Sequence, residues 1–152
     1  MRPVQYAWHR HDRLSVIGSL SISPNSRRLG VAFVVQDTNV RTPDVIAYLR
    51  ALHRQLRRPL IVVLDRLSAH RSAVRKLHQA GARWLTVEWL PPYAPDLNPV
   101  EAMWSYAKYC DLANFVPDDV DHLCDAVINS LGDTHFNQQL LRSFFHSAQL
   151  NL

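Results

Sequence analysis

Two carboxylates, Asp65 and Glu101, stand at points of the sequence where reacting groups are often found. Asp65 directly follows the apolar run from Leu60 to Leu64, and open α/β sheets commonly place reacting groups at the carboxyl ends of such strands. Glu101 lies three residues after Asn98, at the predicted start of a helix. Taken separately, each has an ordinary structural role: Asp65 as a turn or helix cap, and Glu101 as the second member of a capping box that Asn98 opens.

Together the two carboxylates predict a site for hard cations. Asp65 ends one predicted strand and Glu101 opens the helix that follows the next, so both can converge at one edge of a sheet. Carboxylate oxygens suit Mg²⁺ or Mn²⁺, and two such ions can activate a water or a 3′-hydroxyl and stabilise the leaving oxygen of an in-line phosphoryl transfer. The proline-rich loop 90–97 would restrict the position of Glu101 to the narrow range that such a site requires. Cys110 and Cys124 are too soft for it, which argues against zinc.

The basic residues are unevenly distributed along the chain. Residues 1–108 contain 16 Lys and Arg against 7 Asp and Glu, and residues 109–152 contain one against 6, so the formal net charge of +4 combines a +9 body with a −5 tail. Most of the basic residues are arginines, whose planar guanidinium grips phosphate at two points. This pattern predicts a face that binds nucleic acid. The alternative is an arginine excess from a GC-rich genome on an ordinary solvated surface.

Length and composition exclude several classes of protein. A chain of 152 residues with 47% apolar and 20% charged residues fits one globular domain. The apolar run from Leu60 to Leu64 is far short of the roughly 20 residues that a membrane span needs, and the N-terminus lacks the apolar stretch of a signal peptide. Two cysteines without CxxC spacing predict buried thiols in a reducing compartment. We therefore expect a cytoplasmic protein with no membrane partner.

The elements that must position the carboxylates follow from periodicity and turn residues. Alternating apolar residues predict a strand over 14–22, which pairs as a hairpin with a second strand over 30–36. Thr42 is the expected cap of a helix that continues through Pro43 and Asp44 and ends near residue 58. The strand from Leu60 to Leu64 is apolar on both faces, which predicts a fully buried, parallel strand between helices.

The second half of the chain is predicted to be mainly helical. A helix over about 71–80 should end at Gly81, and a strand over about 83–89 should precede the loop 90–97. Beyond the helix that Asn98 opens, two or three helices complete the chain. One of these helices contains an apolar stripe of Val116, Val120, Leu123, Val127, Ile128 and Leu131. The last helix is indicated by Leu140, Leu141, Phe144 and Phe145.

Two segments of the sequence resemble a known family. The segment VVLDRLSAH over 62–70, followed by LPPYAPDLNPVEAMWSYAK over 90–108, resembles the second and third acidic motifs of mariner-like bacterial insertion-sequence transposases, which are DDE-superfamily endonucleases. The flanking segments DRLSVIGSL over 12–20 and LANFVPDD over 112–119 are also similar to that family. The resemblance therefore covers nearly the whole chain.

The resemblance implies a fold, a reaction and roles for individual residues. The implied fold is an RNase H-like α/β domain, in which helices flank a mixed sheet and three carboxylates hold two Mg²⁺ or Mn²⁺ ions. The implied reaction is strand cleavage at the inverted-repeat ends and joining of the freed 3′ ends to target DNA. Asp65 matches the second carboxylate and Glu101 the third. His70 matches the Asp-x4-His position, near the scissile phosphate, although it could instead be a packing or hydrogen-bonding residue.

The chain departs from the family pattern at its N-terminus. In the family the first catalytic Asp lies on a central strand before the hairpin, and here no Asp or Glu precedes Asp12. We therefore expect a single truncated catalytic domain over 1–152, without its first central strand and with a helical C-terminal segment over about 112–150. The missing part would come from an upstream reading frame or a separate subunit, or the gene would be a decayed copy. Asp12 could in principle substitute, and unpaired strand edges could make the chain unstable or homodimeric.

These observations lead to three hypotheses about function. The leading one is the catalytic portion of an insertion-sequence transposase that acts on double-stranded DNA, at transposon ends and target sites, and is inactive without the upstream portion. The second is a non-catalytic DNA-binding or regulatory remnant of a transposase, and the third is a related nuclease of RNase H-like fold. A transposase would be found in the bacterial cytoplasm, at the nucleoid when bound to DNA. The expected DNA contacts are Arg66, Arg71, Arg75, Lys76 and Lys108.

Overall fold

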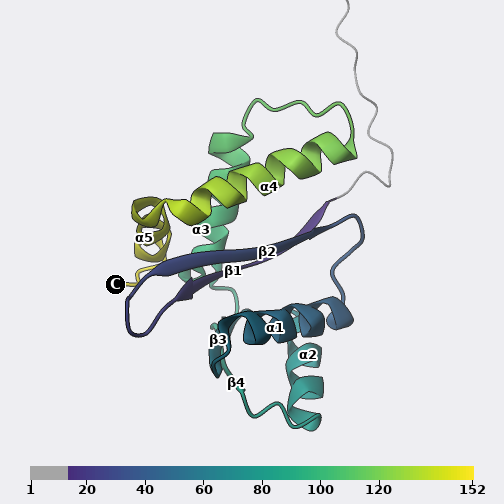
Figure 1. Ribbon diagram of the computed structural model, residues 1–152, viewed down its shortest axis with the longest axis vertical. Coiled ribbons are helices and arrows are strands. Elements are labelled where there is room, and N and C mark those ends of the chain that lie inside the picture. The colour runs from purple at the N-terminus through teal and green to yellow at the C-terminus, as the bar shows by residue number, and fades with distance from the viewer. Residues whose placement is uncertain (1–13) are drawn as a thin grey trace, which may run out of the picture.

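The computed structural model describes residues 14–152, in which four strands form two small sheets (Figure 1). Strand β1 (Ser15–Ile22) pairs antiparallel with β2 (Leu29–Gln36), as the sequence predicted. Strand β3 (Leu60–Leu64) pairs in parallel with β4 (Leu85–Trp89). Asp12, the possible substitute for a first carboxylate, lies outside the described residues.

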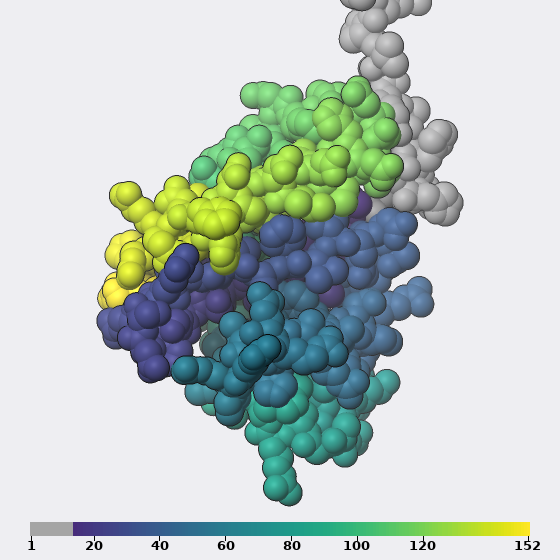
Figure 2. All heavy atoms as spheres, in the orientation of Figure 1, coloured from purple at the N-terminus to yellow at the C-terminus, as the bar shows by residue number. Residues whose placement is uncertain are grey.

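In the part of the chain that the structure describes, five α-helices flank the two sheets. They are α1 (Thr42–Leu56), α2 (Ser68–Gln79), α3 (Pro99–Tyr106), α4 (Val120–Phe136) and α5 (Gln138–Ser147). A 3₁₀ turn (Pro95–Leu97) precedes α3, and a π-helical turn (Ala107–Asp111) follows it. Figure 2 shows the C-terminal helices above the hairpin and the segment from α1 to β4 below it. This arrangement confirms the predicted mixed α/β class.

The first core lies between the hairpin and the C-terminal helices. Leu29 of β2 packs with apolar residues of α3, α4 and α5, among them Met103, Leu131 and Leu141. Strand β1 approaches α3 so closely that a Cβ atom at Gly18 would lie 2.6 Å from Cη2 of Trp104. A glycine is therefore required at this point of β1.

The second core joins β3 and β4 to α1 and α2. Its buried residues are Val45, Leu49, Ala73, Leu77 and Leu85. Tyr48 of α1 connects this unit to the hairpin, because its hydroxyl donates to the Ala32 carbonyl at 2.7 Å and lies 2.8 Å from Oγ of Ser19. Burial raises the pKa of Tyr48 from 10.0 to about 12, because a buried phenolate is poorly solvated.

One prediction about β3 is wrong: the strand is buried on one face only. Ile61 is 77% exposed and Val63 is 59% exposed, whereas Val62 packs into the second core. The physical reason is that α1 and α2 lie on the same side of β3 and β4, while α3, α4 and α5 pack against the hairpin (Figure 1). The other face of the β3–β4 sheet is thus uncovered within residues 14–152.

At its first residues, the outer edge of β2 is bonded by side chains rather than by another strand. The Gln138 amide accepts from the Leu29 N–H and donates to the Leu29 carbonyl, both at 2.9 Å. Nδ1 of His135 accepts from the Val31 N–H at 3.0 Å. In the described part of the chain, β1 and β3 do not pair with each other, and each has a partner on one edge only. Open backbone groups on such edges favour pairing with a further strand.

Several local predictions need correction. The N-cap of α1 is Arg41 rather than Thr42, because the Asp44 carboxylate accepts from the Arg41 N–H at 2.7 Å. Cys110 is exposed and Cys124 is half-buried, so neither is the fully buried thiol that was expected. Val116 precedes α4 and is 76% exposed, which removes it from the apolar stripe.

Over residues 14–152, no helix is long and apolar enough to cross a membrane.

Candidate active site

Asp65 lies immediately after β3, in the turn that leads into α2. Its Oδ1 atom accepts from the Leu67 N–H at 3.1 Å, which is the hydrogen bond of an Asx turn. The same oxygen lies 2.5 Å from Nδ1 of His70. Within the described residues, Oδ2 makes no hydrogen bond. The side chain of Asp65 is 38% exposed, so one carboxylate oxygen is held in place and the other is available to a ligand.

His70 is a hydrogen-bonding partner of Asp65. It lies in the first turn of α2, and its side chain is 20% exposed. An ionised carboxylate can only accept, so Nδ1 is the nitrogen of His70 that carries a proton in this contact. Nε2 is left for other contacts. The structure thus shows His70 as a hydrogen-bonding residue, and a direct role at the scissile phosphate stays a prediction.

Glu101 lies in the first turn of α3, and its side chain is exposed. The predicted helix start is confirmed, because Oδ1 of Asn98 accepts from the Val100 N–H at 3.1 Å and Pro99 occupies the first turn. The predicted capping box is not formed within residues 14–152, since Asn98 caps the helix without a reciprocal bond from Glu101. Capping therefore does not occupy the Glu101 carboxylate.

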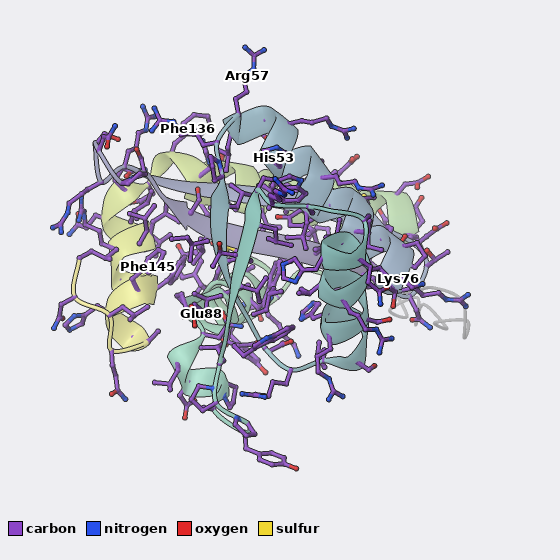
Figure 3. The ribbon with its side chains drawn as sticks, turned by 90° about the horizontal axis from the view of Figure 1, so that it is seen from below. His53, Arg57, Lys76, Glu88, Phe136 and Phe145 are labelled. Atoms are coloured by element: carbon purple, nitrogen blue, oxygen red, sulfur yellow. The ribbon has the colours of Figure 1, made fainter. Side chains whose placement is uncertain are left out.

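The backbone fixes the start of the loop that carries Glu101 beside the turn that carries Asp65. Leu90 donates its N–H to the Leu64 carbonyl at 2.8 Å, and Nε of Arg66 donates to the Leu90 carbonyl at 3.1 Å. Because β3 and β4 are parallel, their carboxyl ends meet at one edge. In Figure 3, β4 runs past Glu88 toward α3 at that edge. Among the described side chains, no cluster of three or more His, Cys, Asp or Glu could hold a metal ion.

Four of the five residues predicted to contact DNA follow Asp65 within eleven positions and are exposed: Arg66, Arg71, Arg75 and Lys76. The fifth, Lys108, is also exposed, but it lies in the π-helical turn, with Nζ 5.3 Å from the centre of the Tyr109 ring. Lys108 thus lies beyond the α-helical part of the segment that Glu101 opens. Trp104 of α3 packs against the first core, close to Gly18.

Within residues 14–152, the positive charges of Arg and Lys are not paired with carboxylates. Between residues of the described chain, the only ion pairs join histidines to aspartates, His70 to Asp65 and His122 to Asp118. No Arg or Lys in that part lies within 4.0 Å of an Asp or Glu oxygen. The guanidinium groups near Asp65 are therefore free to bind an external anion.

The sequence interpretation gave no role to Tyr93, which lies in the loop 90–97 between β4 and α3. Its ring is 102% exposed, and its backbone has φ 57°, in the left-handed region that residues other than glycine rarely adopt. The available signal was an aromatic residue placed between prolines 92 and 95, in a loop that leads from one carboxylate to the other.

Comparison with known proteins gives one finding. A family model described as DDE superfamily endonuclease matches residues 1–124, whereas no curated protein matches the chain. The matched residues include Asp65, His70, Glu101 and every residue predicted to contact DNA. They end within α4.

Proposed function

This chain belongs to the DDE superfamily endonucleases, and from that premise we propose that it is the catalytic portion of a mariner-like bacterial insertion-sequence transposase. Endonucleases of this superfamily act on DNA and generally use divalent metal ions. The proposed reaction is strand cleavage at transposon ends, followed by joining of the freed ends to target DNA. The observation that carries this proposal is the Asp65 carboxylate, held by His70 at the strand edge from which the loop to Glu101 departs.

Asp65 and Glu101 are the proposed metal ligands. Their oxygens match the preference of Mg²⁺ and Mn²⁺ for hard donors, and both carboxylates keep at least one oxygen free of hydrogen bonds in the described chain. When bound, such ions would activate the attacking oxygen and stabilise the leaving one. The role of His70 is to fix the orientation of Asp65. Hydrogen bonds from neighbouring residues to metal ligands usually increase the affinity for the metal in this way.

A third carboxylate is proposed to come from a strand that inserts between β1 and β3. Both strands offer an edge with no partner among the described residues, whereas the outer edge of β2 is already bonded at Leu29 and Val31 by Gln138 and His135. A polypeptide from an upstream reading frame could supply this strand, in which case residues 1–152 act as one domain that is inactive alone. A second copy at the same edge would give a homodimer. The proposed location is the bacterial cytoplasm, at the nucleoid when DNA is bound.

The metal assignment is tested by calorimetry with Mn²⁺. We expect Asp65→Asn and Glu101→Gln each to weaken Mn²⁺ binding while the circular dichroism spectrum stays unchanged. Glu101→Gln is the sharper variant, because the helix cap is made by Asn98 and does not need a carboxylate at position 101. The matched control is Glu88→Gln, at an exposed glutamate on β4 (Figure 3). Equal Mn²⁺ affinity in wild type and both site variants would refute the assignment.

The catalytic proposal is tested by nicking of transposon-end DNA in Mg²⁺. We expect no nicking by the 152-residue chain, and nicking when the upstream polypeptide is added or fused before Met1. If the chain nicks alone and Asp12→Asn abolishes the activity, Asp12 is the first carboxylate and no added strand is needed. The alternative function is a DNA-binding or regulatory remnant, which the presence of only two candidate ligands in the described chain favours. A fused protein that folds and binds DNA but does not nick would establish that alternative.

A further inference from the structure

The loop between β4 and α3 presents one aromatic ring entirely to solvent. Tyr93 is 102% exposed, more than any other large apolar or aromatic side chain in the described chain. Its φ of 57° belongs to the left-handed region, so the loop holds the residue in a conformation that tyrosine seldom adopts. An aromatic side chain gains nothing from full contact with water, and residues in sparsely populated backbone conformations cluster at functional sites.

The loop is anchored at both ends. Leu90 is bonded through its N–H to the strand that carries Asp65 and through its carbonyl to the side chain of Arg66. At the other end, the 3₁₀ turn Pro95–Leu97 runs directly into Asn98, which caps α3. Three prolines in this segment fix their own φ angles, which limits the ways in which the ring could fold back onto the protein. Tyr93 is thus held outward from the edge where the loop begins.

The surroundings of the ring favour a nucleic acid base as its partner. Arg66 lies at the base of the loop and Arg71 follows in α2, and neither is paired with a carboxylate of residues 14–152. A cationic surface attracts the phosphate backbone, and an aromatic ring on such a surface is a stacking platform for bases. In an intact duplex the base faces are covered by their neighbours. An unpaired base, whose face is open, is therefore the partner that fits Tyr93.

We propose that Tyr93 stacks on an unpaired base of a DNA end or junction held at the Asp65–Glu101 edge. The inference rests on the proposed function, because it assumes that DNA reaches this edge. It adds that the protein distinguishes an open strand end from a closed duplex, and that the residue responsible is neither a metal ligand nor a phosphate contact.

The test uses a duplex with a short 3′ overhang that carries 2-aminopurine, whose fluorescence falls when the base stacks. Binding is measured in EDTA, so no cleavage can interfere. We expect quenching by wild type, an overhang affinity roughly five- to a hundredfold weaker for Tyr93→Ala, and a blunt-duplex affinity that is unchanged. Tyr93→Phe keeps the ring and should keep both properties. The control is Phe136→Ala, at a 78% exposed ring near the end of α4, far from the end of β4 (Figure 3).

The outcomes separate the two proposals. If wild type binds blunt duplex but Tyr93→Ala binds the overhang as well as wild type does, the stacking inference is wrong and the proposed function stands. An equal loss on overhang and blunt DNA would mean a general contact, and it would also overturn the inference. If wild type binds no DNA at low salt, the proposed function fails together with the inference. Circular dichroism of Tyr93→Ala should match wild type, because the ring contributes to no core.

Discussion

The contribution of α2 to DNA binding can be predicted in magnitude. The variant is the triple substitution Arg71→Ala, Arg75→Ala and Lys76→Ala. All three side chains are exposed, and the buried face of α2 is formed by Ala73, Val74 and Leu77. The variant should therefore fold as wild type does, with three fewer positive charges beside Asp65.

The magnitude follows from counterion release. Because none of the three groups is paired with a carboxylate of the described chain, each is free to neutralise one phosphate. Each such contact contributes about 0.9 to the slope of log K against log of the salt concentration. Losing three contacts should reduce the slope by about 2.7, which corresponds to roughly a 500-fold weaker affinity at about 0.1 M salt.

The assay is fluorescence anisotropy of a labelled blunt duplex, titrated at several KCl concentrations. The matched control is the triple substitution Arg54→Ala, Arg57→Ala and Arg58→Ala, which removes the same charge. These residues lie at the end of α1 and just before β3, at the opposite end of that strand from Asp65. Figure 3 shows Arg57 well separated from Lys76. The control should keep most of the wild-type slope.

Two results would refute this reasoning. If the slope of the α2 variant falls by less than about 0.9, not even one of its three side chains contacts phosphate. If the control loses as much of the slope as the α2 variant, DNA binds to the general charge of the protein rather than to the edge that carries Asp65.

Three further predictions concern stability, each measured by urea denaturation. Gly18→Ala should destabilise the fold by about 1–3 kcal/mol, because the added Cβ would meet Trp104 at 2.6 Å, and an unchanged midpoint would contradict that close approach. Tyr48→Phe should cost about 1–3 kcal/mol through its two hydrogen bonds. Because the pKa of Tyr48 is raised to about 12, wild type should be fully stabilised below pH 10 and lose this stability as pH rises from about 10 to about 12, a loss that the Phe variant should lack. Gln138→Ala should cost about 1–3 kcal/mol and promote aggregation seen by light scattering, since it exposes the edge of β2 at Leu29; a monodisperse variant of wild-type stability would argue against this.

The sequence predicted those features of the site that depend on neighbouring residues. The strand Leu60–Leu64, the turn at Asp65 and the cap at Asn98 are encoded by apolar runs and cap residues within a few positions, and the structure has all three. The spacing of Asp65 and His70 is equally local, and the structure shows their contact. Local patterns fix these features because turn and cap hydrogen bonds form between residues a few positions apart.

Features that depend on distant packing were not predictable. The apolar pattern of β3 is the same whether or not a layer covers Ile61, and only the placement of the C-terminal helices on the hairpin leaves that residue exposed. The contacts of Gln138 with Leu29 join residues 109 positions apart, so no local sequence pattern predicts them. The left-handed backbone of Tyr93 depends on how the whole loop is anchored at Leu90 and Asn98.

The bonds of Gln138 and His135 affect which edge of the hairpin a further strand can join. The backbone of Leu29 and the Val31 N–H on β2 are already bonded to side chains, whereas the free edge of β1 carries no partner strand in the described chain. A second copy would therefore join more readily at β1, which gives a four-stranded sheet. Removing Gln138 would free Leu29 for a partner strand at the start of β2, and units that can pair at both edges can polymerise. The amide of Gln138 thus favours a discrete complex over an open chain of hairpins.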